Sequence, residues 1–264
     1  MKYNSKTFTE SLQAQGRIVF EAQELVRFLD ISRKASIEIL SRWMKARHVV
    51  SLTRGLYALI HPSEKENGVR PLHIIDELMR YRHCRYYVGL LSAADYWGAA
   101  EQKPMWLQVV VSHNLTLRKK QSLGIRIYTR KHEEVVGLVQ GKTDAGPFIL
   151  SGPALTALDV VTFENQCGGL DHVSQVVKRL VPLIRAQDLK MCAETYCPVT
   201  SLQRLGFLME RHGAKSTVLG VLQKKLERLR PPMVVLTPLG ATVSTQNKRW
   251  NILINHQMEE NDDL

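Results

Sequence analysis

Residues 16–59 constrain the fold most, because they combine two short amphipathic helices with a tight turn between them. Residues 21–29 place apolar side chains at helical spacing, and Asp30-Ile31 forms the turn. Ser32 is a good N-cap for a second helix over residues 33–46. Two helices joined by so short a turn are typical of a helix-turn-helix.

A β-hairpin follows the second helix directly. Residues 48–52 and 56–59 are β-rich, and Thr53-Arg54-Gly55 is the short turn between them. A short extended run at 17–20 precedes the first helix. The pattern predicts a winged helix-turn-helix domain over residues 1–62, and such a unit can place one helix in the major groove of DNA.

The two sides of the predicted second helix differ in chemistry. Its inner side is expected to carry Ala35, Ile39, Leu40, Trp43 and Ala46. The helix dipole favours acids in a first turn, so Arg33 and Lys34 there indicate an anionic ligand. Lys and Arg can contact guanine or phosphate, and an aliphatic side chain can contact a thymine methyl group. We predict these DNA-binding residues: Ser32, Arg33, Lys34, Ile37, Ser41, Lys45 and, at the hairpin turn, Arg54. The alternative is a solvated basic face on a module that binds protein.

Composition sets broader limits. The chain has 264 residues, which is room for about two domains. Its formal net charge of +11 favours a polyanionic partner. We expect no membrane span, because no apolar stretch reaches about eighteen residues, and no secretory signal, because the N-terminus lacks an apolar core. The four cysteines are scattered, which favours reduced thiols in a cytoplasmic protein over a zinc site.

The remainder of the chain, residues 70–264, is predicted to be a mixed α/β domain. Strands are expected at 86–88, 106–111, 125–129, 135–139, 148–150 and 250–254, and helices at 72–83, 92–97, 153–163, 171–183, 200–209 and 216–229. The helix at 200–209 is expected to open with a capping box, and Asp171 is expected to cap the one before it. The fold class is therefore α+β: an N-terminal winged helix-turn-helix, then a mixed domain with strands first and helices later.

A second basic segment, residues 117–131, contains no acid. Its cations are Arg118, Lys119, Lys120, Arg126, Arg130 and Lys131. Alternate residues of a strand share a face, so this segment could form a second phosphate-contacting surface that clamps the duplex. The other interpretation is a solvated edge strand that Lys and Arg protect from aggregation.

No spacing in the chain is typical of catalysis or metal binding. The sequence has no HxxxH or HExxH pair, no GxxxxGK[ST] loop and no Ser in GxSxG. Asp76-Glu77 and Glu133-Glu134 are adjacent acids, which point in different directions and form no acid/base pair unaided. We expect no catalytic residues, no metal and no cofactor, and therefore no enzyme.

Several runs, taken in order, resemble the AbiEi family of antitoxins. In the N-terminal part they are the predicted second helix and the following wing, with Arg54-Gly55-Leu56-Tyr57. In the rest of the chain they are residues 86–98, 155–161, 168–170, 203–206, 236–238 and 247–251. This chain departs from the family pattern at the wing, because its turn is very short for a wing that reaches into the minor groove.

The resemblance implies two activities within abortive-infection (type IV) toxin–antitoxin pairs, which act in phage defence. Such proteins bind inverted repeats in their own promoter through the winged helix and repress the operon. Their C-terminal part counteracts a toxin with a nucleotidyltransferase fold. The implied partners are double-stranded DNA and a cognate toxin. By elimination, we expect the toxin at the outer faces of the helices over 171–183, 200–211 and 216–229.

Three points stay open on sequence grounds. The first open point is how many copies bind DNA, and a monomer that binds cooperatively is among the alternatives. The chain could also be a stand-alone winged-helix transcription factor whose second domain senses a small molecule. A nucleic-acid-processing enzyme with a catalytic C-terminal domain is the remaining alternative.

Overall fold

The fold is taken from a computed structural model that describes residues 4–66, 68–117, 122–130, 135–195, 198–240 and 245–258. The chain divides into two compact units. The first contains Met1–Tyr87, Met105–Lys131 and Gln140–Ile149, and the second contains Val88–Pro104, His132–Val139 and Leu150–Leu264. The domains expected at 1–62 and 70–264 stay a prediction, and the segment between them falls within the first unit.

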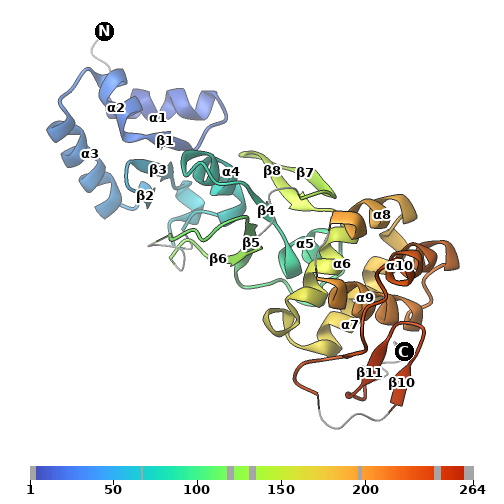
Figure 1. Ribbon diagram of the computed structural model, residues 1–264. Coiled ribbons are helices and arrows are strands. Elements are labelled where there is room, and N and C mark those ends of the chain that lie inside the picture. Colours follow the sequence, from blue (N-terminus) through green and yellow to red (C-terminus); the bar gives the residue numbers. More distant parts are fainter. Residues whose placement is uncertain are drawn as a thin grey trace. The chain divides into compact units, whose positions relative to one another are not determined.

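The first unit begins with an order of elements that fits a winged helix-turn-helix. These are α1 (Ser5–Ala14), β1 (Val19–Glu21), α2 (Ala22–Leu29), α3 (Arg33–Lys45), β2 (Val49–Thr53) and β3 (Leu56–Leu59), with strand order β1-β3-β2 (Figure 1). Ser32 caps α3 as predicted, accepting a hydrogen bond from the Ala35 amide at 3.2 Å. Asp30 ends α2 in a left-handed conformation, with φ of 52°.

An aromatic core holds these elements together. Phe8 of α1 packs edge-on against Phe20 and Phe28, with ring centroids 5.2 and 5.3 Å apart. Leu40 of α3 is buried in the same cluster, and Trp43 packs against it. Ala46 differs from the expectation, because α3 ends at Lys45 and leaves Ala46 as an exposed C-cap.

The first unit also contains α4 and most of a five-stranded sheet. The elements are α4 (Pro71–Tyr81), β4 (Tyr86–Val88), β5 (Leu107–Val111), β6 (Ile125–Thr129), β7 (Leu138–Thr143) and β8 (Gly146–Ser151). The strand order is β6-β5-β4-β8-β7, with β5 parallel to β6 and β4 parallel to β8. The strand expected at 135–139 is therefore displaced to β7.

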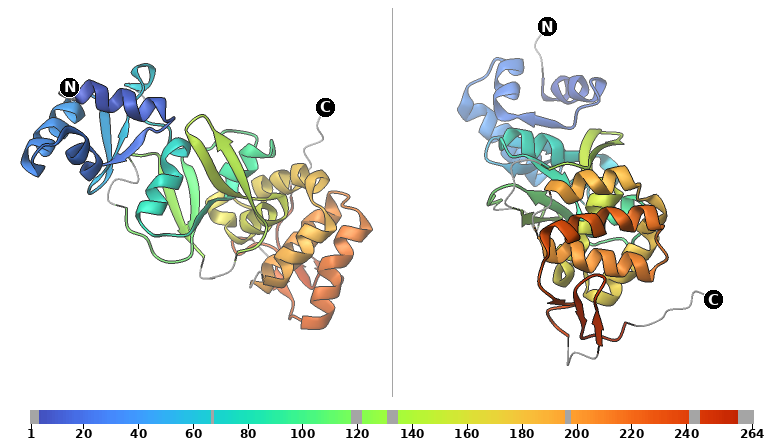
Figure 2. Two further views of the ribbon diagram at one scale, coloured as in Figure 1. Left: turned by 90° about the horizontal axis from the view of Figure 1, so that it is seen from above. Right: turned by 45° about the vertical axis from the view of Figure 1, so that its right-hand side comes forward.

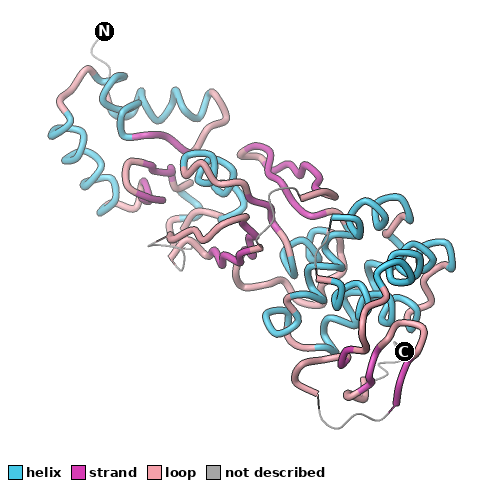
Figure 3. Tube along the Cα trace, viewed as in Figure 1, coloured by secondary structure: helices cyan, strands magenta, loops and turns pink. Residues whose placement is uncertain are grey.

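Helices dominate the second unit, as Figure 3 shows for the trace after β8. They are α5 (Leu90–Tyr96), α6 (Pro153–Thr162), α7 (Leu170–Leu180), α8 (Ala186–Thr195), α9 (Val199–Arg211) and α10 (Ser216–Leu229). The mixed fold with strands first and helices later is confirmed. Two local expectations were wrong. Pro198 precedes α9 and no capping box forms there, and the residue before α7 is Gly169, with Asp171 in its first turn.

A three-stranded sheet closes the chain and is fixed to α9 by one tryptophan. It contains β9 (Val234–Val235), β10 (Thr245–Asn247) and β11 (Ile252–Ile254) in the order β10-β11-β9. Trp250 is fully buried, and its indole nitrogen donates to Glu210 Oε2 at 2.7 Å. A Cβ at Gly206 would lie 2.2 Å from the Trp250 ring, so α9 and the ring are in close contact. Gln203 Nε2 donates to the carbonyls of Pro232, Trp250 and Asn251 at 3.0, 3.3 and 3.1 Å. We call these residues the Trp250 clasp.

No helix within the described ranges combines the length and the apolar character that crossing a membrane requires.

Candidate nucleic-acid interface

The outer face of α3 is a basic, solvent-exposed surface. Arg33, Lys34 and Lys45 are exposed, and Ile37 is 59% exposed between them. Ser41 is half-buried, and the Ser32 side chain is engaged as the N-cap. In the part of the chain that the structure describes, no carboxylate pairs with these three cations. Their charge is therefore available to an external anion, and Figure 2 shows the outer side of α3 uncovered within its unit.

The hairpin turn is anchored on two sides. The Gly55 carbonyl accepts from the Ala22 amide at 2.9 Å, and the Tyr81 hydroxyl donates to the Arg54 carbonyl at 3.1 Å. Gly55 has φ of +87°, and a Cβ there would lie 2.7 Å from the Tyr81 hydroxyl oxygen. The Arg54 side chain itself is exposed. The turn is thus held while its cation stays in solvent. Sequence reasoning missed Tyr81, because the contact links residues far apart in the chain.

Replacing Tyr81 by Phe tests this anchor. The loss of one hydrogen bond is expected to lower the free energy of unfolding by about 0.5–1.5 kcal/mol, measured by urea denaturation. Tyr57→Phe is the matched control, because no hydrogen bond from the Tyr57 hydroxyl is formed among the described residues and its ring packs in the same domain. Equal stability of Tyr81→Phe and the parent chain would show that the bond contributes nothing.

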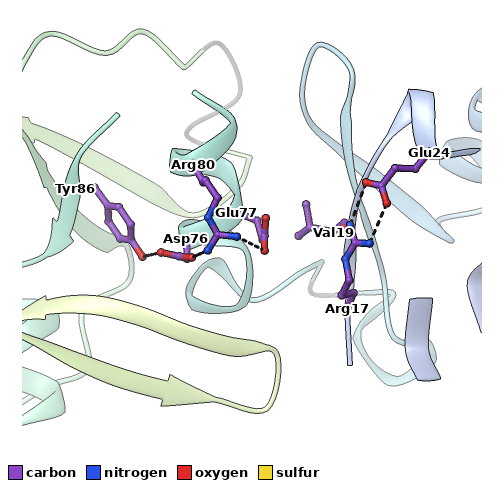
Figure 4. Close-up of polar contacts among 7 residues, drawn as sticks. All are labelled: Arg17, Val19, Glu24, Asp76, Glu77, Arg80 and Tyr86. Atoms are coloured by element: carbon purple, nitrogen blue, oxygen red, sulfur yellow. Dashed lines mark hydrogen bonds and ion pairs between the residues drawn. The ribbon is translucent and has the colours of Figure 1, made fainter. Parts of the chain in front are cut away.

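A charged cleft of about 620 Å³ lies beside β1, α2 and α4 in the first unit. Arg17 pairs with Glu24 at 2.9 Å and donates to the Val19 carbonyl at 3.3 Å, as Figure 4 shows. The hydrogen bond to Glu24 raises the pKa of Arg17. Across the cleft, Arg80 bridges the two adjacent acids of α4.

Tyr86 completes this polar set. Its hydroxyl donates to Asp76 Oδ1 at 3.0 Å and accepts from the Ile149 amide at 3.3 Å (Figure 4). Burial raises the pKa of Tyr86, so it stays a neutral hydrogen-bond donor. Asp76 and Glu77, the adjacent acids of the sequence, are both engaged by Arg80. We interpret these contacts as structural.

The structure places only one of the six cations predicted for the second basic surface, Arg126, as an exposed side chain among the described residues. Arg126 is exposed on the edge strand β6, with its guanidinium 5.3 Å from the centroid of the Trp106 ring. Arg130 is only 8% exposed and donates to the Tyr87 hydroxyl at 3.3 Å. A buried guanidinium cannot reach a phosphate, so Arg130 must be removed from the predicted surface. Arg118, Lys119, Lys120 and Lys131 lie outside the described residues.

Within the described ranges, no three His, Cys, Asp or Glu side chains lie close enough to hold a metal ion. Cys84, Cys167 and Cys192 are buried, and they form no disulfide within the part of the chain that the structure describes. Burial raises the pKa of the Cys84 and Cys167 thiols, which disfavours the reactive thiolate.

Residues 87–211 match the family model of the AbiEi antitoxin C-terminal domain. The chain carries an AbiEi antitoxin domain. The resemblance seen in the sequence is confirmed, and the domain supports an antitoxin role. The crystal structure of the RV2827C protein from Mycobacterium tuberculosis is similar in fold, with 14% identity and a TM-score of 0.69 over 92% of this chain and 88% of that one. A comparison with curated proteins finds no match.

The motifs that identify the AbiEi domain are mainly scaffold. Trp97 Nε1 donates to the Ser151 carbonyl at 2.9 Å, which joins α5 to the end of β8. Leu155, Leu158 and Val160 of α6 are buried, and Gln203 belongs to the Trp250 clasp. Such residues explain the shared fold. Binding surfaces of the AbiEi domain must therefore be sought among exposed side chains outside these motifs.

Proposed function

We propose that this chain is a DNA-binding antitoxin of a type IV pair that acts in phage defence. In this proposal it binds inverted repeats in its own promoter through α3, represses its operon and counteracts a nucleotidyltransferase-like toxin. The AbiEi domain supports the antitoxin part. The observation that carries the DNA-binding part is the exposed face of α3, where Arg33, Lys34 and Lys45 surround an exposed Ile37.

The chemistry of this face suits duplex DNA. The first residues of a recognition helix meet base edges, where Arg or Lys can contact guanine O6 and N7. Ile37 offers an apolar contact to a thymine methyl group. Arg54 at the anchored turn supplies a phosphate contact, and the net charge of +11 favours association with the backbone.

Two experiments test the proposal. The purified chain should bind its own promoter repeats more tightly than a scrambled duplex of equal length and salt, measured by fluorescence anisotropy. Co-expression with the adjacent gene should restore growth that the adjacent gene alone inhibits. Binding without sequence preference, or no rescue of growth, would contradict the corresponding half. A small molecule that shifts operator affinity would favour a sensor, and metal-dependent cleavage of nucleic acid would favour an enzyme.

A second DNA surface near residues 118–120 stays a prediction. The double variant Lys119→Glu/Lys120→Glu is expected to make the slope of log affinity against log salt less negative by about two units, one per lost phosphate contact. Lys103→Glu/Lys142→Glu is the control, because it changes the net charge equally at two other exposed lysines. An unchanged slope in the first variant would leave α3 and the wing as the whole interface.

A further inference from the structure

Three consecutive backbone carbonyls at the tip of the β2–β3 hairpin each accept a hydrogen bond. The Thr53 carbonyl accepts from Ser51 Oγ at 3.3 Å, within the hairpin itself. The Arg54 carbonyl accepts from the Tyr81 hydroxyl at 3.1 Å, and the carbonyl of the following glycine accepts from the Ala22 amide at 2.9 Å. The three donors belong to β2, to the C-terminal end of α4 and to the start of α2. The backbone of the tip is therefore fixed from three elements.

Helix α4 reaches the tip because it packs against β3, the second strand of the hairpin (Figure 1). Tyr81 is the last residue of α4 and is half-buried at this contact. Burial raises the pKa of Tyr57 in β3, and the nearby Tyr81 phenol adds to this rise. Helix α4 lies outside residues 1–62, the predicted winged helix-turn-helix. Part of the support of the wing thus comes from the segment that follows it.

The fixed tip carries a cation that stays in solvent. The Arg54 side chain is exposed, although its own carbonyl and both neighbouring carbonyls are bonded. A flexible loop loses backbone entropy when a ligand orders it. A loop that is already ordered avoids this loss, and binding is tighter as a result. The tip of this wing is therefore preorganised to present one guanidinium to an anion.

We propose that Tyr81 is a positioning residue for DNA binding, which fixes the wing tip from α4 so that Arg54 contacts a backbone phosphate of the duplex. This inference rests on the proposed function, because it assigns how the DNA-contacting wing is supported. A phosphate contact carries no direct sequence information. The contribution of Tyr81 should therefore be equal on the promoter repeats and on a scrambled duplex.

The test measures the affinity of the full chain for both duplexes by fluorescence anisotropy at several salt concentrations. Arg54→Ala is expected to make the slope of log affinity against log salt less negative by about one, for one lost phosphate contact. Tyr81→Phe is expected to weaken binding of both duplexes by about fivefold with the slope unchanged. The slope stays because the phosphate contact still forms, but only after the tip has become ordered.

The double variant Arg54→Ala/Tyr81→Phe separates positioning from general support of the fold. Without the arginine, the order of the tip has nothing to position. Tyr81→Phe is therefore expected to change affinity by less than about twofold in the Arg54→Ala background. A residue that only stabilises the surrounding unit would instead weaken binding by the same factor in both backgrounds.

Two further variants check the assignment. Ser51→Ala removes the hydrogen bond to the Thr53 carbonyl, and it is expected to weaken binding by about twofold, again only when Arg54 is present. Tyr57→Phe leaves all three hydrogen bonds of the tip in place and should keep the affinity of the parent chain. Far-UV circular dichroism establishes that each variant is folded at the temperature of the binding measurement.

Three outcomes would overturn the assignment. The first is equal DNA affinity of Tyr81→Phe and the parent chain. The second is an equal loss from Tyr81→Phe with and without Arg54. The third is an unchanged affinity of Arg54→Ala, which would show that the wing tip does not contact DNA. Equal binding of both duplexes by the parent chain would instead contradict the proposed operator recognition. The coupling between Arg54 and Tyr81 can still be measured in that case, so the two failures are distinguishable.

Discussion

Replacing Trp250 by Ala is expected to lower the free energy of unfolding by about 3–5 kcal/mol. The ring is fully buried, and its removal leaves a cavity against α9. It also leaves the half-buried Glu210 carboxylate without the indole donor, although the ion pair with Arg249 remains. Urea denaturation followed by far-UV circular dichroism measures the loss, since fluorescence would change with the tryptophan itself.

Gly206 supplies the sharper form of this test. Gly206→Ala places a Cβ 2.2 Å from the Trp250 ring, and such overpacking typically costs about 1–3 kcal/mol. In the Trp250→Ala background the same change should be neutral or stabilising by about 1 kcal/mol, since alanine is the better helix former. The double-mutant cycle therefore reports the contact itself.

Gly220→Ala is the control for this cycle. A Cβ at Gly220 meets nothing within 4 Å, so the change is expected to stabilise the chain by about 0.5–1 kcal/mol. If Gly206→Ala lowers the free energy of unfolding equally in both backgrounds, the Trp250 ring is not the reason why position 206 requires glycine.

The double variant Arg33→Ala/Lys34→Ala is expected to weaken operator binding by about 1–3 kcal/mol for each lost base contact. Both side chains are exposed in the first turn of α3, so the change should leave the fold intact. Neutralisation of the toxin should also persist, since the AbiEi domain at residues 87–211 does not include α3.

The measurement is anisotropy against the promoter repeats and against a scrambled duplex. Lost base contacts reduce the preference between the two duplexes, whereas lost phosphate contacts weaken both equally and reduce the salt slope by about one per contact. Lys6→Ala/Lys103→Ala is the matched control, with the same charge change at two exposed lysines that are not part of α3. Unaltered affinity of Arg33→Ala/Lys34→Ala would refute α3 as the reading helix.

Local signals in the sequence predicted the N-terminal elements well. The cap at Ser32, the apolar spacing of α2 and the short turn at Arg54-Gly55 all act within a few residues. The long amphipathic helix α10 was predicted to the residue for the same reason. Such elements carry their own pattern, whatever packs against them.

Elements and contacts that depend on distant partners were missed. Helix α8 buries only Leu189, Cys192 and Ala193, which is too weak a stripe to mark a helix. Strands β9 and β10 are two and three residues long and exist through their pairing with β11. Arg130 is buried and donates a hydrogen bond to Tyr87, a partner 43 residues earlier in the chain. No local pattern reports such a contact.

The hairpin turn has a consequence for how this protein can vary. The hydroxyl oxygen of Tyr81 makes the hydrogen bond to the Arg54 carbonyl, and it also fills the space that a Cβ at position 55 would need. Positions 55 and 81 are far apart in the sequence, yet the residue at one of them limits which residues the other can accept. A larger residue in place of Gly55 would require a smaller residue in place of Tyr81, and the hydrogen bond to the Arg54 carbonyl would then be lost.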